Sequence, residues 1–288
     1  MASNRVNLAA GLYFVATPIG SARDITLRCL DILASADVLA AEDTRSLRKL
    51  MDIHGVSLDG RHVLAYHDHS GPAVRTRILA EIAAGKSVAY ASEAGTPLIA
   101  DPGFQLGRAV IEEGGVVTAA PGASAILTAL TVSGLPTDRF FFAGFAPNSQ
   151  TARRRLFEEL AEVPGTLVFY ESPKRISKML SDLIAVYGAD RPAVIARELT
   201  KKFEEVLRGT LGELAQSLAD KALKGEIVVL VDRAGEFEMS QDELQVLVAD
   251  ALKTSSLKDA VAHVVSQTGL PRRRVYQLAL ELEKGNLG

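Results

Sequence analysis

Short apolar runs that alternate with helical stretches constrain this chain more than any other feature of its sequence. In the first half, runs typical of buried strands lie at residues 12–16, 38–41, 62–66, 87–90 and 115–119. Helical spacing of apolar residues appears between them, as in the stretch 26–33 with Leu27, Leu30 and Leu33. Strands that alternate with helices build a parallel sheet through right-handed crossovers. We therefore expect an α/β domain with a parallel sheet over residues 1–137.

Each of these runs ends in a polar or Gly/Pro-rich loop, and the first candidate among these loops is Ala91–Gly103. It lies between the strand at 87–90 and a helix predicted over 104–111, and it carries two carboxylates, Glu93 and Asp101. In an open α/β sheet, ligands bind at the carboxyl ends of the strands, where such loops converge. This edge of the sheet is therefore the first candidate for a functional site.

The second half predicts another α/β domain, over residues 138–236, after a boundary at 134–136. Strands are expected at 140–145, 166–170, 193–197, 205–208 and 227–231, and helices at 151–161, 174–187 and 211–218. No helix separates the strands at 193–197 and 205–208, which predicts a mixed sheet. The remaining part, 237–288, reads as three helices at 242–252, 257–267 and 272–283. The turn at 268–271 gives this tail the size and turn chemistry of a helix-turn-helix unit.

Composition indicates the class and the cellular compartment of the protein, but not its chemistry. The formal net charge is −3, which excludes a polybasic protein but leaves room for a local basic face. Cys29 is the only cysteine, so neither an internal disulfide nor a thiolate metal cluster is expected. No apolar run has membrane-spanning length. We expect a cytoplasmic protein without a membrane contact.

Familiar phosphate-binding motifs are missing, and the polar loops allow more than one interpretation. Neither a G-x-G-x-x-G after the first strand nor a Walker A lysine is present. The run His67-Asp68-His69 allows a metal site, a substrate-binding loop or a plain polar loop, and we predict no metal because a fourth ligand is not evident. In Glu42–Arg45, Asp43 or Thr44 is a candidate helix N-cap as well as a substrate contact. The loop 121–124 can equally be an ordinary loop that ends in a serine cap.

Basic residues form four clusters that have two possible meanings. They lie at 153–155, at 174–178, at 201–202 and at 272–274. Each alone is most often a solvated surface, but together they are a candidate track for a polynucleotide backbone. Acidic residues slightly outnumber basic ones in the tail, which weakens that interpretation there.

An ordered set of motifs resembles one family over nearly the whole chain. The motifs are TPIG at 17–20, AEDTR at 41–45, HDH at 67–69, SEAGTPLIADPG at 92–103, PGASA at 121–125, GLPTDRF at 134–140, FYES at 169–172, ARELTK at 196–201 and KGE at 224–226. This set resembles the bacterial ribosomal RNA small-subunit methyltransferase I family of the tetrapyrrole methylase (class III) superfamily. Members methylate a cytidine 2′-hydroxyl in the decoding region of 16S rRNA. No single motif is diagnostic, whereas the ordered set is highly specific.

The resemblance implies a homodimer in which two α/β domains hold S-adenosylmethionine (SAM) between them. It assigns cofactor contacts to the first-domain residues Pro18, Glu93, Gly95, Thr96, Pro97, Leu98, Ile99, Ser124 and Ala125, and to the second-domain residues Tyr170, Glu171, Arg197, Glu198, Gly225, Glu226 and Ile227. Two positions depart from the family pattern, which usually has Asp at Glu93 and Asn at Ser21. The first departure leaves the role of that carboxylate open.

Methyl transfer to a ribose oxygen needs alignment and a base for the hydroxyl proton. Asp43, His67 and His69 are the base candidates, with Asp24 and Asp101 behind them. Predicted substrate contacts are Arg23, Asp24, Glu42, Arg45, Asp101, Lys174 and Arg175. The partner is then 16S rRNA, either free or in the small subunit. Alternatives are a methyltransferase for a small tetrapyrrole, since fold does not fix substrate, and an RNA-binding module with a vestigial pocket.

Overall fold

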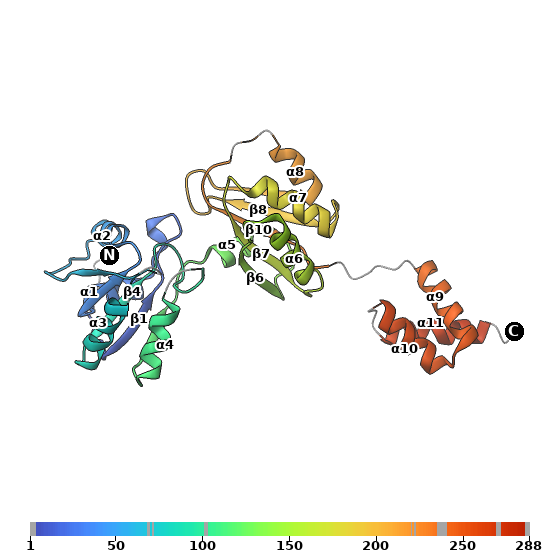
Figure 1. Ribbon diagram of the computed structural model, residues 1–288, viewed down its shortest axis with the longest axis horizontal. Coiled ribbons are helices and arrows are strands. Elements are labelled where there is room, and N and C mark those ends of the chain that lie inside the picture. The colour runs from blue at the N-terminus through green and yellow to red at the C-terminus, as the bar shows by residue number, and fades with distance from the viewer. Residues whose placement is uncertain are drawn as a thin grey trace.

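The computed structural model contains two α/β domains and a group of three C-terminal helices (Figure 1). It describes residues 4–67, 70, 72–100, 103–219, 221, 223–234, 241–268 and 272–285. The fold class predicted from the sequence is therefore confirmed.

The first domain has a five-stranded parallel sheet in the order β3-β2-β4-β1-β5. Its strands are β1 (Gly11–Val15), β2 (Val38–Ala41), β3 (Val63–Ala65), β4 (Ser87–Ala91) and β5 (Val117–Ala120). The prediction placed the start of the last strand two residues early. Gly115 instead closes the preceding helix by donating its N–H to Val110 O at 2.8 Å. All five carboxyl ends nevertheless meet at one edge, as predicted.

Helices cover both faces of this sheet. The helical elements are η1 (Ala22–Asp24), α1 (Leu27–Ser35), α2 (Thr44–Ile53), α3 (Pro72–Ala83) and α4 (Phe104–Glu112). Helices α1 and α2 bury Leu33 and Met51 on one face. Helices α3 and α4 bury Ile78 and Leu106 on the other face. The sheet is thus the middle layer between two apolar faces. Its polar side chains available for binding lie at the ends of the strands.

The second sheet is mixed, in the order β6-β7-β10-β8-β9, as the missing helix predicted. Its strands are β6 (Phe140–Phe145), β7 (Thr166–Glu171), β8 (Pro192–Arg197), β9 (Glu205–Thr210) and β10 (Ile227–Val231). Strands β6 and β7 are parallel and the other pairs are antiparallel. Helices α6 (Gln150–Leu160), α7 (Ile176–Tyr187) and α8 (Leu211–Leu218) cover one face.

The other face of the second sheet is covered by α5 (Ala125–Ser133), which leaves the last strand of the first domain. Ile126, Ala129 and Leu130 of this helix pack against Val228 and Leu230 of β10. In Figure 1, α5 lies between the two domains. Helix α5 connects the two domains and is packed in the core of the second. It therefore fixes the orientation of the strand ends of the first domain relative to the second sheet.

A buried ion-pair network corrects one part of the interpretation of residues 153–155 as a polynucleotide track. Arg153 is 4% exposed, and its Nε and Nη2 donate to Asp182 Oδ2 at 2.8 and 2.5 Å. Arg154 Nε donates to the other carboxylate oxygen of Asp182 at 2.6 Å. The prediction is wrong for Arg153, because a buried guanidinium that satisfies a buried carboxylate is not available to RNA.

The C-terminal part is a separate three-helix unit with its own apolar core. It contains α9 (Gln241–Thr254), α10 (Leu257–Thr268) and α11 (Arg272–Gly285), which agree closely with the three predicted helices. Leu244, Val248, Val261, Val264 and Val275 are buried among them. Of the predicted turn at 268–271, only Thr268 lies within the described residues, as the last residue of α10. No helix in the described ranges is both long and apolar enough to cross a membrane.

Candidate functional site

Three strand-end loops of the first domain are joined by hydrogen bonds. The backbones of Thr17 and Gly95 exchange two hydrogen bonds, of 2.9 and 3.0 Å. Ser92 Oγ donates to Gly95 O at 2.6 Å, and Thr96 Oγ1 donates to Ala123 O at 3.0 Å. The loops that follow β1, β4 and β5 therefore form one surface at the predicted edge of the sheet.

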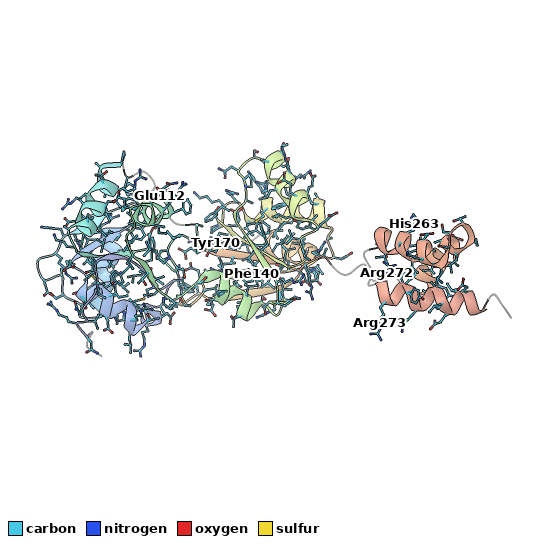
Figure 2. All side chains as sticks on the ribbon, turned by 90° about the horizontal axis from the view of Figure 1, so that it is seen from below. Glu112, Phe140, Tyr170, His263, Arg272 and Arg273 are labelled. Atoms are coloured by element: carbon cyan, nitrogen blue, oxygen red, sulfur yellow. The ribbon has the colours of Figure 1, made fainter. Side chains whose placement is uncertain are left out.

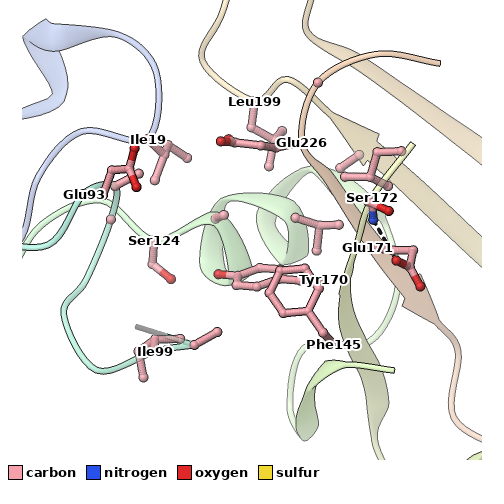
Figure 3. Close-up of a pocket in the computed structure, with 18 of the residues that line it drawn as sticks. Ile19, Glu93, Ile99, Ser124, Phe145, Tyr170, Glu171, Ser172, Leu199 and Glu226 are labelled. Carbon is pink, nitrogen blue, oxygen red and sulfur yellow. Dashed lines mark hydrogen bonds between the residues drawn. The ribbon is translucent and has the colours of Figure 1, made fainter. Parts of the chain in front are cut away.

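A cavity of about 450 Å³ lies between this surface and the second domain (Figure 3). Its volume is within the usual range for small-molecule sites. The lining residues come from both domains: Ile19, Glu93, Ala94, Gly95, Thr96, Ile99, Ala100, Ser124 and Ala125 from the first, and Phe145, Tyr170, Glu171, Ser172, Pro173, Ala196, Leu199, Gly225, Glu226, Ile227 and Val228 from the second.

Aromatic rings form one wall of the cavity. Tyr170 makes edge-on contacts with Phe142 and Phe145, with ring centroids 4.9 and 5.6 Å apart. Figure 2 shows Tyr170 between the two α/β domains, and Figure 3 shows its ring beside that of Phe145. An aromatic wall of this kind suits the flat face of a heterocyclic ligand.

Carboxylates surround the opposite side of the cavity. Glu93 belongs to the first domain, and its backbone N–H donates to Glu42 Oε2 at 3.4 Å. Partial burial, and then the negative charges of Glu42, Asp43 and Glu226, raise the pKa of Glu93. Among the described residues, no hydrogen bond to the Glu93 carboxylate is formed. This carboxylate is therefore available to a ligand and more basic than an ordinary glutamate.

The turn at Gly225–Glu226 is held in place by Glu198. The Glu198 carboxylate accepts hydrogen bonds from the Glu226 N–H at 3.0 Å and from Lys201 Nζ at 3.1 Å. The Glu226 N–H, together with Lys201, lowers the pKa of Glu198. Gly225 has φ +90°, and a Cβ there would collide with the Glu198 carboxyl group. Glycine therefore avoids both a strained backbone and displacement of the Glu198 carboxylate that holds the turn.

Comparison with known proteins decides the family. Residues 11–215 match the family model of tetrapyrrole (corrin/porphyrin) methylases, and residues 238–283 match the RsmI C-terminal HTH domain. A ribosomal RNA small subunit methyltransferase I from Mesorhizobium japonicum is 42% identical, over 96% of this chain and 93% of its own length. The protein of the same name from Vibrio cholerae is 42% identical, over 98% of this chain and 97% of its own length. The chain belongs to the ribosomal RNA small subunit methyltransferase I family.

Solved structures of other tetrapyrrole methylases share the fold of this family member. Cobalt precorrin-4 methyltransferase has a TM-score of 0.59 at 19% identity, covering 77% of this chain and 94% of its own. Uroporphyrin-III C-methyltransferase from Thermus thermophilus, in complex with S-adenosyl homocysteine, has a TM-score of 0.52 at 18% identity, covering 76% of this chain and 96% of its own.

Most of the cofactor residues that resemblance to the methyltransferase I family predicted line the cavity. They are Glu93, Gly95, Thr96, Ile99, Ser124, Ala125, Tyr170, Glu171, Gly225, Glu226 and Ile227. Pro18, Pro97, Leu98, Arg197 and Glu198 are not part of the lining. Of these, Arg197 donates to Glu205 and to Lys224 O, next to the Gly225 turn.

Glu171 lines the cavity without pointing its carboxylate into it. Successive residues of a strand face opposite sides of a sheet, so Glu171 faces away from the side of Tyr170. Its Oε1 accepts from the Ser172 N–H at 2.8 Å and pairs with Arg175 Nε at 3.1 Å. Arg175 also donates to Asn148 Oδ1 and Ala146 O. Both predicted contact residues thus stabilise the segment that leads from β7 into α7.

None of the predicted base candidates in the described ranges lines the cavity. Asp43 is the N-cap of α2, and its Oδ1 accepts from the Arg45 N–H at 2.7 Å and the Ser46 N–H at 3.4 Å. The Arg45 hydrogen bond is the main cause that lowers the pKa of Asp43. His67 is exposed after β3 and does not line the cavity. His69 and Asp101 lie outside the described residues.

The predicted substrate contacts that remain are charged residues outside the cavity lining. The Arg45 side chain is 90% exposed at the start of α2, and Lys174 is exposed just before α7. Arg23 and Asp24 are exposed on η1, while Glu42 lies under the Glu93 backbone. Across the described part of the chain, no group of three or more His, Cys, Asp or Glu side chains is arranged to hold a metal ion.

Sequence reasoning missed several apolar lining residues, among them Ile19, Phe145, Leu199 and Val228. Ile19 and Leu199 lie inside motifs that carry the family resemblance. Their position next to polar motif residues is the sequence feature that indicates a place in the site. Phe145 and Val228 belong to predicted strands, and only the pairing of the second sheet shows which side they face.

Proposed function

We propose that this chain transfers the methyl group of SAM to the 2′-hydroxyl of a cytidine in the decoding region of 16S rRNA. SAM-dependent methylation of ribosomal RNA is supported by full-length relatives that are named ribosomal RNA small subunit methyltransferase I. The observation that carries the proposal is a cavity built jointly from the predicted cofactor loops of both domains.

The residues around the cavity fit the chemistry of SAM. The aromatic wall of Tyr170 and Phe145 suits an adenine ring, and the apolar side chains of Ile19, Ile99 and Leu199 exclude water. The carboxylates of Glu93 and Glu226 lower the electrostatic potential at the other side, which favours a cationic ligand. When bound, SAM supplies an electrophilic methyl group on a positively charged sulfur.

Glu93 is the described residue best suited to take the proton of the ribose hydroxyl. It lines the cavity, and its raised pKa makes its carboxylate a stronger base than Asp43, whose pKa is lowered and whose Oδ1 caps α2. Removal of the proton makes the oxygen a nucleophile for in-line attack, and the apolar lining of the cavity limits the access of water to the methyl group. Asp43, His67 and His69 remain test positions for this role.

The three parts of the chain divide these tasks. Residues 1–137 supply the strand-end loops, residues 138–236 close the cavity from the second sheet, and residues 237–288 add affinity for RNA. Contacts to the phosphates that flank the target nucleotide are assigned to Arg45 and Lys174, because both are exposed and positively charged.

Replacing Arg272, Arg273 and Arg274 together by alanine is expected to weaken binding of small-subunit RNA. All three are exposed at the start of α11 with Tyr276, which is 43% exposed, and none forms an ion pair with another described residue. Figure 2 shows Arg272 and Arg273 on the C-terminal unit. The slope of log affinity against log salt concentration should become shallower by up to about 2, because each neutralised phosphate contributes about 0.7 to that slope. Filter binding over a salt series measures it, and SAM affinity should not change.

Arg155→Ala is the matched control, because Arg155 is an exposed arginine on α6 that pairs with Glu159. It should leave the salt slope as in the wild type. An unchanged slope in the triple variant would contradict the role of the C-terminal unit.

We infer that the chain works as a homodimer. Strand β6 is an edge of the second sheet and exposes Phe140 and Phe141, which are 44% and 43% exposed. Light scattering should give twice the mass of one chain, and Phe141→Asp should shift the particle toward one chain, because a buried charge opposes association. A wild-type protein that has the mass of one chain at micromolar concentration would contradict the inference.

Calorimetry with SAM separates this proposal from a vestigial pocket. Saturable binding of one SAM per chain is expected, and a filled cavity, as in Ala125→Trp, should abolish it. A folded wild-type protein that does not bind SAM would rule the proposal out.

A further inference from the structure

Two turns from different domains meet at the rim of the cavity. The Ser21 N–H of the first domain donates to Thr200 Oγ1 of the second at 3.1 Å. Gly20 approaches so closely that a Cβ would lie 2.5 Å from Lys201 Cγ and 2.6 Å from Thr200 Oγ1. Their neighbours Ile19 and Leu199 are 7% and 6% exposed and line the cavity from above in Figure 3. The contact therefore covers one side of the cavity.

The second-domain turn is held in an unfavourable backbone conformation. Glu198 and Thr200 have φ values of +50° and +64°, in the left-handed region that residues with a Cβ rarely adopt. In the first-domain loop that lines the same cavity, Leu98 and Ala100 have φ values of +73° and +56°. Only one further non-glycine residue in the described ranges, Asp59, has a positive φ. Strain of this kind is concentrated at ligand clamps, where the surrounding structure enforces it.

Side-chain hydrogen bonds hold the strained turn together from the second domain alone. The Thr200 N–H donates to Glu204 Oε2 at 2.5 Å. Lys201 Nζ bridges the carboxylates of Glu198 and Glu226, at 3.1 and 2.9 Å. Glu226 lines the cavity, so the turn that touches the first domain is also joined to the cavity wall.

We propose that Gly20–Ser21 and Glu198–Lys201 form an interdomain clasp that opens to admit the cofactor and closes over it. Thr200 is the positioning residue, because its hydroxyl accepts the hydrogen bond that joins the two domains. That the occupant is SAM rests on the proposed function, whereas the clasp itself follows from the contacts between the domains. A cofactor enclosed by the clasp leaves only as fast as the clasp opens.

Thr200→Val tests the clasp, because it removes the hydroxyl and keeps the shape of the side chain. The SAM dissociation rate, measured by stopped-flow fluorescence, should rise roughly two- to tenfold, the range expected when one hydrogen bond is removed. Thr200→Ser restores the hydroxyl and should stay within about twofold of the wild type. Thr76→Val, on exposed α3, is the control for the substitution itself and should have no effect. Equal rates in Thr200→Val and the wild type, or in Thr200→Val and Thr200→Ser, would overturn the proposal.

A measurement without cofactor keeps the clasp testable even when SAM does not bind. Spin labels at Arg108→Cys and Lys178→Cys, both exposed and in different domains, report the interdomain distance by pulsed electron resonance. Cys29 is buried and need not be replaced. Gly20→Ala should shift or broaden the distance distribution, since the added Cβ must displace Lys201 and Thr200. If Gly20→Ala and the protein with Gly20 give identical distance distributions, the clasp proposal is overturned. If the wild-type protein fails to bind SAM, only the identity of the occupant is overturned.

Discussion

Glu93→Gln is expected to lower kcat for methyl transfer to small-subunit RNA by about 10²–10⁴-fold, the usual contribution of a positioned general base. Glutamine keeps the size of the side chain but does not accept a proton. SAM affinity should fall no more than about fivefold, because one pair of unit charges in water is worth about 1 kcal/mol. Single-turnover kinetics at saturating SAM separates the two effects.

The pH profile adds a second readout for Glu93. Its carboxylate must be ionised to accept a proton, so activity rises with pH as Glu93 loses its own proton. Because burial and neighbouring carboxylates raise the pKa of Glu93, the acid limb should lie above the pKa of an ordinary glutamate. Glu93→Asp should keep part of the activity, since the shorter carboxylate is the residue that the family pattern usually has.

Variants at the other candidates decide whether the base has been assigned correctly. Asp43→Asn keeps a good N-cap for α2 and should leave kcat near the wild-type value, as should His67→Ala. A loss of activity at Asp43, His67 or His69 larger than that at Glu93 would contradict the assignment.

Asp182→Ala is expected to destabilise the protein by about 3–5 kcal/mol, because it leaves Arg153 charged, buried and unpaired. This loss is a large part of the roughly 5–15 kcal/mol that holds a typical domain folded. Urea denaturation followed by circular dichroism measures it. Glu159→Ala, which breaks an exposed pair with Arg155 on α6, the helix that carries Arg153, should cost less than about 0.5 kcal/mol. Similar losses in both variants would contradict the role of burial.

The sign of the pH effect follows from the pKa of Asp182. Burial raises this pKa, but hydrogen bonds from Arg154, Arg153 and Gln150 outweigh burial and lower it below the ordinary value of 3.8. The stabilisation is therefore complete at neutral pH and is lost as the pH falls below about 4 through the folded-state pKa. Asp182→Asn should show a weaker dependence of stability on pH in that range.

The strand-end site was predictable because its location depends on local patterns. Apolar runs that end in polar loops, with helices between them, are enough to bring Thr17, Gly95 and Ala123 to one edge of a parallel sheet. The same reasoning predicted the mixed second sheet from a missing helix. The apolar pattern does not predict the bounds of α2 and α3, at 44–53 and 72–83. The prediction of Asp43 as a possible N-cap of α2 is confirmed.

Features that depend on contacts between distant segments were not predictable in this way. Whether Glu171 points into the cavity depends on which face of β7 packs against α7. The burial of Arg153 depends on Asp182, which lies on another helix. Nothing local connects Ser21 to Thr200, because the two residues meet only when both domains are folded and placed side by side.

The most direct test of the central claim is transfer of labelled methyl groups from SAM to small ribosomal subunits that lack this modification. We predict incorporation of one methyl group per small-subunit RNA, at a cytidine whose 3′ phosphodiester bond resists alkaline cleavage, because the 2′-oxygen no longer attacks it. Cavity variant Ala125→Trp should abolish incorporation. Label on a base, label on no RNA, or incorporation that survives a filled cavity would contradict the proposed function.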